Sequence, residues 1–254
     1  MMKTTLRAYA LCVSLVLAAA PGQAQNAPAE MSAADLAGRM NAHRQGPDSH
    51  ARLKLDTGSA GTLQLEGKSR RGGSEVVYRV LWPKERKGEA VLLRPGGGTH
   101  FIPPDKLQPA QMSQTFFGSA LANADLVENF FAWPQQTIVG SETVSRVNCI
   151  ILESKPGKSG SIYGSVKSWI DTRRMVPMRV EKYSSSGQLV RRIDTTRVAN
   201  DDRRRPIPAN LSVTGPRGVK SEVDGSKIKH GVKFDDSEFT PEGLKAEGGR
   251  PAPE

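Results

Sequence analysis

The sequence predicts a mainly β domain of antiparallel strands with a few short helices. From Ser49 onward, polar and apolar residues alternate with period two in short segments, as they do in half-buried strands. Turns rich in glycine, proline or charge separate these segments about every ten residues. The regular alternation of strand and long helix that marks βαβ units is missing. A single all-β domain is feasible at this length.

The first predicted element is a helix of about eleven residues. Ser32 is a candidate N-cap, and Asp35 follows three residues later, as in a capping box. Leu36 and Met40 lie four residues apart, on one face of this helix. Gly46-Pro47 ends it.

The first group of strands follows this helix. We expect strands at residues 49–56, 62–66, 75–82, 88–94 and 99–102. Tyr78 and Trp82 share one face of the third strand with Val76 and Val80. Residues 103–112 are expected to be irregular.

A second helix is predicted after Asn123, its expected N-cap. Leu126 would pair with Phe130 and Val127 with Phe131, which gives the helix an aromatic apolar side. Trp133-Pro134 would close it.

A second group of strands completes the domain. They are expected at residues 136–145, 148–154, 162–171, 176–183, 188–199, 205–213 and 219–232. Ser184 to Gly187 is a candidate hairpin loop, with glycine where positive φ is needed.

The N-terminus has the features of a signal peptide. Lys3 and Arg7 precede an apolar run, and Gly22-Gln23-Ala24 offers a small-x-small cleavage pattern. We expect residues 1–24 to be removed after Ala24, because the apolar run is shorter than the roughly 20 residues that span a bilayer. A retained membrane anchor is the alternative. The further divisions are a leader with the first helix (25–48), the domain (49–245) and a disordered tail (246–254).

The mature chain would be basic and without an internal disulfide. The net charge of +10 loses the charges of Lys3 and Arg7, which leaves +8, and Cys149 is its one cysteine. Export argues against nucleic acid as a partner. Anionic lipid, or simply a solvated basic surface, accounts for the charge.

Motifs for catalysis and metal binding are absent from the sequence. His43, His50, His100 and His230 fall in no metal-ligand spacing, and Gly96-Gly97-Gly98 has no helix after it to hold phosphate. We therefore predict no catalytic residue, no metal and no cofactor. The charged run Arg203 to Arg205 is interpreted as a solvated sheet edge, or alternatively as a contact for head groups or an acidic transporter.

Several segments together resemble a known family. FFGSALANADL, VGSETVSRVNCIILESKP and WIDTRRMVPMRVEKYSSSGQL, in this order, are similar to the LolA-like outer-membrane lipoprotein-sorting proteins. The segment from Thr62 to Lys106 is similar to that family's opening meander, so the resemblance covers about residues 50–245. Asp105-Lys106-Leu107-Gln108-Pro109 replaces a basic run of the family, which places the chain in an uncharacterised branch.

The resemblance implies an incomplete, strongly curved antiparallel β-barrel covered by short helices, whose hollow holds acyl chains. The expected function is a periplasmic carrier of lipid or lipoprotein, with an inner-membrane transporter or outer-membrane acceptor as further partners. A sensor or accessory protein of an inner-membrane lipid exporter is the alternative. The residues expected to line or cover the hollow are Tyr78, Trp82, Phe116, Phe117, Leu126, Val127, Phe130, Phe131 and Trp133. Ordinary core packing of a helix on a sheet predicts the same aromatic residues.

Overall fold

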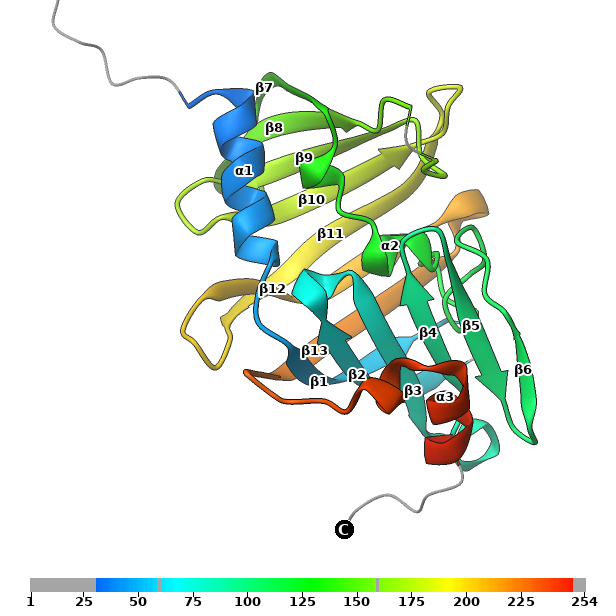
Figure 1. The fold of residues 1–254 in the computed structure, drawn as a ribbon. Helices are drawn as coiled ribbons and strands as arrows, with labels where there is room; N and C mark the ends of the chain where they lie inside the picture. The colour runs from blue at the N-terminus through cyan, green and yellow to red at the C-terminus, as the bar shows by residue number, and fades with distance from the viewer. Residues whose placement is uncertain (1–30, 59–60, 159, 249–254) are drawn as a thin grey trace, which may run out of the picture. The chain divides into compact units, whose positions relative to one another are not determined.

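One open antiparallel sheet organises the part of the chain that the computed structural model describes, residues 31–58, 61–158 and 160–248. The predicted signal peptide and leader, residues 1–30, and the end of the predicted tail lie outside these residues. Thirteen strands are found in the described ranges, in the order β6-β5-β4-β3-β2-β1-β13-β12-β11-β10-β9-β8-β7 (Figure 1). The ends of this order, β6 and β7, do not pair, so the sheet does not close.

Two meanders make up the sheet, and they meet in its middle, where the first strand in the chain, β1, pairs with the last, β13. The first meander is β1(Ser49–Asp56), β2(Thr62–Arg70), β3(Glu75–Trp82), β4(Ala90–Arg94), β5(Gly97–Ile102) and β6(Lys106–Pro109). The second is β7(Gln135–Val144), β8(Val147–Lys155), β9(Ser165–Asp171), β10(Val176–Tyr183), β11(Leu189–Asn200), β12(Pro206–Thr214) and β13(Lys220–His230). Leu55 of β1 faces Val223 of β13 at the junction. The predicted mainly β fold is confirmed.

The helix α1(Ala33–Arg44) begins and ends as the sequence predicts. The hydroxyl of Ser32 accepts a hydrogen bond from the backbone N–H of Asp35 at 3.1 Å, which satisfies an otherwise unpaired amide. Leu36 and Met40 are buried against the sheet. This packing anchors the helix to the sheet, together with a hydrogen bond of 2.6 Å from the Asn129 amide to Asn41 Oδ1.

The segment from Ala110 to Pro134, here the crossing segment, joins β6 to β7. Because these are opposite edges of the sheet, the chain must traverse one face between them. Figure 1 shows the crossing segment, with the short helix α2(Ala124–Val127), on the same face as α1. We call this the inner face.

The opposite, outer face carries its own cover. The helix α3(Pro241–Gly248) and the 3-10 turn η5(Asp236–Phe239) pack on β3 to β5 through Phe239 and Leu244, which are fully buried. Val76 faces the inner cluster and Val77 the outer one, so these strands are buried on both sides. Helix α3 also extends three residues into the predicted tail, 246–254.

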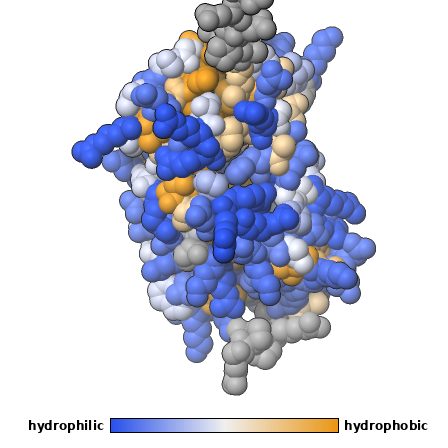
Figure 2. All heavy atoms as spheres, turned by 90° about the vertical axis from the view of Figure 1, so that its left-hand side faces the viewer, coloured by the Kyte–Doolittle hydropathy of each residue, from blue (hydrophilic) through white to orange (hydrophobic). Residues whose placement is uncertain are grey.

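Figure 2 views the molecule from the side of α1. Apolar side chains gather on the upper part of this side, and hydrophilic side chains surround them. None of the helices in the described ranges has the length and apolar character needed to cross a membrane.

Candidate functional site

The crossing segment is mostly irregular, and the helix predicted after Asn123 begins there but is much shorter than expected. Only residues 124–127 are α-helical, and a separate 3-10 turn, η3(Phe130–Ala132), follows. The side chain of Asn123 makes no cap; its amide donates to the carbonyl of Gln111 at 2.9 Å. Leu126 and Val127 pack in a different cluster from Phe130 and Phe131, which breaks the predicted pairs. Tertiary contacts override the helical pattern here.

A buried charge cluster centred on Asp125 fixes the crossing segment to the sheet. The carboxylate oxygens lie 2.6 Å from Lys182 Nζ and 3.1 Å from Arg191 Nη1. The hydroxyl of Tyr163 and the backbone N–H of Ala122 each donate to the carboxylate at 2.7 Å. Burial opposes the charge of Asp125, but Lys182 and Arg191 outweigh it and hold the pKa of this carboxyl below its usual value.

Further contacts hold the preceding loop in place. Arg191 Nε donates to the carbonyl of Ala120 at 2.5 Å, and Ser221 Oγ accepts from the backbone N–H of Ala120 at 3.0 Å. Gly215 makes a close approach here, because a Cβ at this position would lie 2.9 Å from the Ala120 carbonyl oxygen. The crossing segment is therefore bound to β10, β11 and β13.

The crossing segment contributes to two apolar clusters on the inner face. The first cluster lies on β1 to β4 and β12, and it includes Phe116, Phe117 and Val127, with Leu126 and Tyr78 packed against it. The Tyr78 ring meets the Phe116 ring edge-on at 5.1 Å. The lack of a side chain at Gly67 leaves room for that tyrosine, since a Cβ there would lie 2.8 Å from its ring.

The second cluster joins α1 to β8, β9 and β10. Phe130 and Phe131 are buried in it beside Leu36 and Met40, and Trp133 packs against its rim. Trp82 belongs to neither inner-face cluster and is 51% exposed. The nine residues expected at the hollow thus divide between two clusters and one surface position.

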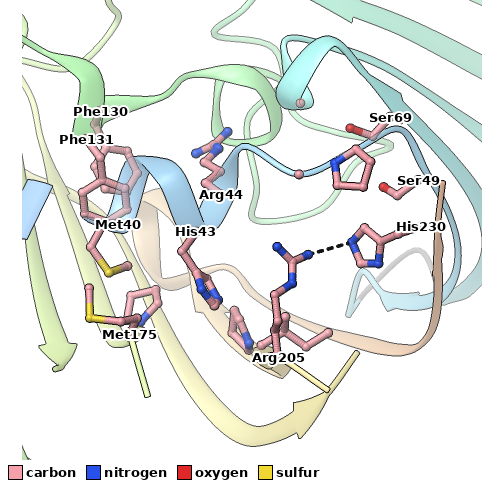
Figure 3. Close-up of a pocket in the computed structure, with 16 residues that line it drawn as sticks. Met40, His43, Arg44, Ser49, Ser69, Phe130, Phe131, Met175, Arg205 and His230 are labelled. Carbon is pink, nitrogen blue, oxygen red and sulfur yellow. Dashed lines mark hydrogen bonds between the residues drawn. The ribbon is translucent and has the colours of Figure 1, made fainter. Parts of the chain in front are cut away.

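A cavity of about 310 Å³ opens beside the second cluster, between the C-terminal half of α1 and the ends of several strands (Figure 3). This volume is at the lower end of the range for small-molecule pockets, about 300–1,000 Å³. Its lining is Met40, His43, Arg44, Gly46, Pro47, Ser49, Ser69, Gly73, Phe130, Phe131, Met175, Pro177, Arg205, Ile207, Pro208 and His230. Of the nine expected residues, Phe130 and Phe131 line it.

The cavity has an apolar side and a basic side. Figure 3 shows Phe130, Phe131, Met40 and Met175 grouped together, with Arg205 and His230 across the opening from them. Apolar walls with a few polar groups are typical of ligand pockets. The arrangement suits a molecule with a hydrocarbon part and a polar end.

Most polar groups on the basic side already have partners. His43 Nε2 lies 3.0 Å from the carbonyl oxygen of Pro206. Arg205 Nε donates to Asp201 at 2.9 Å, and Arg205 Nη2 lies 3.2 Å from His230 Nε2. His230 Nδ1 in turn lies 2.5 Å from Asp202.

Asp201, Asp202 and His230 come close enough to form a candidate metal site in the described residues, which their sequence spacing does not reveal. Their atoms are engaged in other ways. Burial opposes the charge of Asp201, but backbone N–H groups and the Arg205 guanidinium bond it and lower the pKa of its carboxyl. The Arg203 to Arg205 run belongs to the turn between the interior strands β11 and β12, so the sheet-edge interpretation is wrong.

Sequence reasoning missed most of the cavity. Met175 and Arg205 directly precede β10 and β12, and His230 ends β13, so these residues meet only through the pairing of the strands. Met40 was expected on the buried face of its helix, but nothing in its spacing indicated a cavity. Arg44 carries no sequence signal beyond being a cation at a helix C-terminus.

Comparison with known proteins agrees with this architecture. Residues 100–246 match the model of a family described as "Uncharacterized protein". No curated protein matches the chain. A DUF1329-family protein from Desulfovibrio piger superposes with a TM-score of 0.74 at 20% identity, covering 84% of this chain and 97% of that one.

Two further solved structures share the fold. An outer membrane lipoprotein-sorting protein domain from Vibrio parahaemolyticus gives a TM-score of 0.74 at 19% identity, covering 84% of this chain and 98% of that domain. A LolA-superfamily protein from Nitrosomonas europaea gives 0.67 at 20% identity, covering 82% and 97%. The family model spans more than half of the chain, and the shared fold is that of the LolA superfamily. The chain therefore belongs to the family whose model carries the description "Uncharacterized protein", and it shares its fold with a LolA-superfamily protein.

Proposed function

We propose that this protein is a periplasmic carrier that binds acyl chains of lipids or lipoproteins reversibly and without covalent chemistry. The observation that carries the proposal is the cavity between α1, η3 and the strand ends, with Phe130 and Phe131 in its wall. Two of the structures that share the fold are called a lipoprotein-sorting domain and a LolA-superfamily protein. The predicted signal peptide supports the compartment.

The driving force would be burial of hydrocarbon. Each buried CH₂ group contributes about 0.8 kcal/mol, so several methylenes give useful affinity without specific polar contacts. The existing cavity is small, and much of the inner face is already filled by the protein's own aromatic side chains. Larger cargo would need α1 or η3 to move, whereas Asp125 keeps the middle of the crossing segment in place.

The test is binding of a fluorescent fatty acid to the wild-type protein and to the double variant Phe130→Gln/Phe131→Gln. Binding should be lost in the double variant, because both rings line the cavity. The matched control is Phe101→Gln/Phe239→Gln, which alters two buried phenylalanines on the outer face.

Melting curves of all three proteins separate binding from stability. Loss of binding in the inner-face variant, with binding kept in an equally destabilised outer-face variant, supports the carrier. No binding to the wild type, or equal loss in both variants, would count against it and leave Phe130 and Phe131 as core residues.

A further inference from the structure

Arg44 is a cation without a partner at the edge of an apolar cavity. Its guanidinium makes no hydrogen bond and no ion pair with the residues that the structure describes. Figure 3 shows it between the phenylalanine pair and Ser69, pointing away from His43. Arginine stays protonated in proteins, so the edge of the cavity carries a positive charge that no carboxylate in the described ranges pairs with directly.

The Arg44 side chain is half-buried at this edge of the cavity. Burial lowers the pKa of Arg44, and the negative charge of Glu128 offsets only part of that effect. Glu128 does not pair with it: its carboxylate accepts from Ser161 Oγ at 2.9 Å. The other basic groups of the cavity wall, His43, Arg205 and His230, have partners of their own.

Tyr78 adds a second polar group near Arg44. Burial raises the pKa of its hydroxyl, and the positive charge of Arg44 lowers that pKa by a smaller amount. Within the described ranges this hydroxyl has no hydrogen-bond partner, although its ring is packed against Phe116. Tyr78 does not line the cavity, so the guanidinium of Arg44 supplies the donors for an anion there.

We propose that Arg44 binds the anionic head group, a carboxylate or a phosphate, of an amphiphile whose hydrocarbon chain lies against Met40, Phe130 and Phe131. This rests on the proposed function and narrows it to acyl ligands with a negatively charged end. Arginine binds both kinds of anion through paired N–H donors, and such bonds are stronger where water is excluded. The small cavity favours one chain over several.

The test compares three ten-carbon compounds, decanoate, decyl phosphate and decanol, by isothermal titration calorimetry on the mature protein. The wild type should bind at least one of the two anions about 10- to 100-fold more tightly than the neutral alcohol. Which anion binds more tightly distinguishes a carboxylate from a phosphate ligand. In Arg44→Met, the preference should vanish while the affinity for decanol stays the same or rises.

The matched control is Arg39→Met, an exposed arginine of the same helix, which changes the net charge equally. It should keep the preference for the anion. Arg44→Met should also melt no lower than the wild type, because it removes an unpaired, partly buried charge.

Three results would overturn the head-group site: no anion preference in the wild type, a preference that survives in Arg44→Met, or one that is lost equally in Arg39→Met. If decanol binds in these cases, acyl binding stands and only the role of Arg44 fails. If none of the three compounds binds the wild type, the proposed carrier function fails with it.

Discussion

Lys182 and Asp125 form an ion pair of 2.6 Å between Nζ and Oδ1, with both side chains almost completely buried. The pair links β10 to the middle of the crossing segment, between the two apolar clusters of the inner face. Lys182 Nζ also lies 4.8 Å from the Tyr163 ring centre and 5.4 Å from that of Phe130. The cover of the inner face is thus anchored by charge as well as by apolar contact.

Removing the carboxylate should destabilise the protein strongly. Asp125→Asn leaves Lys182 and Arg191 buried without their counter-charge, which costs about 3–5 kcal/mol. Urea denaturation measures this loss. The control Asp224→Asn breaks an exposed pair with Arg197, 3.4 Å apart, and should change stability by less than about 1 kcal/mol. Equal effects of the two changes would show that the buried pair is not an anchor.

The same carboxylate predicts a pH dependence. Because the folded-state pKa of Asp125 lies below its unfolded value of about 3.9, its contribution is present above that pH. The contribution is lost as the pH falls through the folded-state pKa, since the unfolded chain takes up the proton first. The free energy of unfolding should therefore fall more steeply below about pH 4 in the wild type than in Asp125→Asn. If the free energy of unfolding depends on pH in the same way in both proteins, Asp125 does not have a lowered pKa in the folded state.

The start of α1 offers a smaller, local test. Ser32→Ala removes the acceptor for the backbone N–H of Asp35 and should cost about 1 kcal/mol of stability. Ser32→Gly should cost only a few tenths of that, because glycine is tolerated at an N-cap. Thermal melts of the two variants check the order. If Ser32→Ala melts at the wild-type temperature, the cap contributes nothing.

The signal-peptide pattern predicts the N-terminus of the mature protein. Cleavage after Ala24 would leave Gln25 as the first residue, without a lipid. The intact mass of protein recovered from the periplasm tests this expectation. A retained leader or an added acyl mass would show that the N-terminus serves as an anchor.

The strands could be predicted from sequence because period-two alternation is a local signal. β6(Lys106–Pro109) is the exception: it is only four residues long and all four are exposed, so no buried face marks it in the sequence. The helix α1 was predictable for the same local reason, since its cap and its buried face lie within nine residues.

The crossing segment and the cavity were not predictable in this way. Asp125 meets Lys182 and Arg191 across 57 and 66 positions of the chain, and the helix that the apolar spacing predicts ends at Val127. Phe130 and Phe131 were expected at the site as part of that helix, and they reach the cavity through η3 instead. Arg44 could not be recognised as unpaired until its neighbours were known.

Native mass spectrometry of protein purified from its own periplasm without detergent tests the carrier most directly. We expect part of the wild-type protein to carry the added mass of an acyl lipid, and this adduct to be absent from Phe130→Gln/Phe131→Gln. Wild-type protein that shows only the mass of the polypeptide would contradict carriage and favour a sensor or accessory role for the same fold.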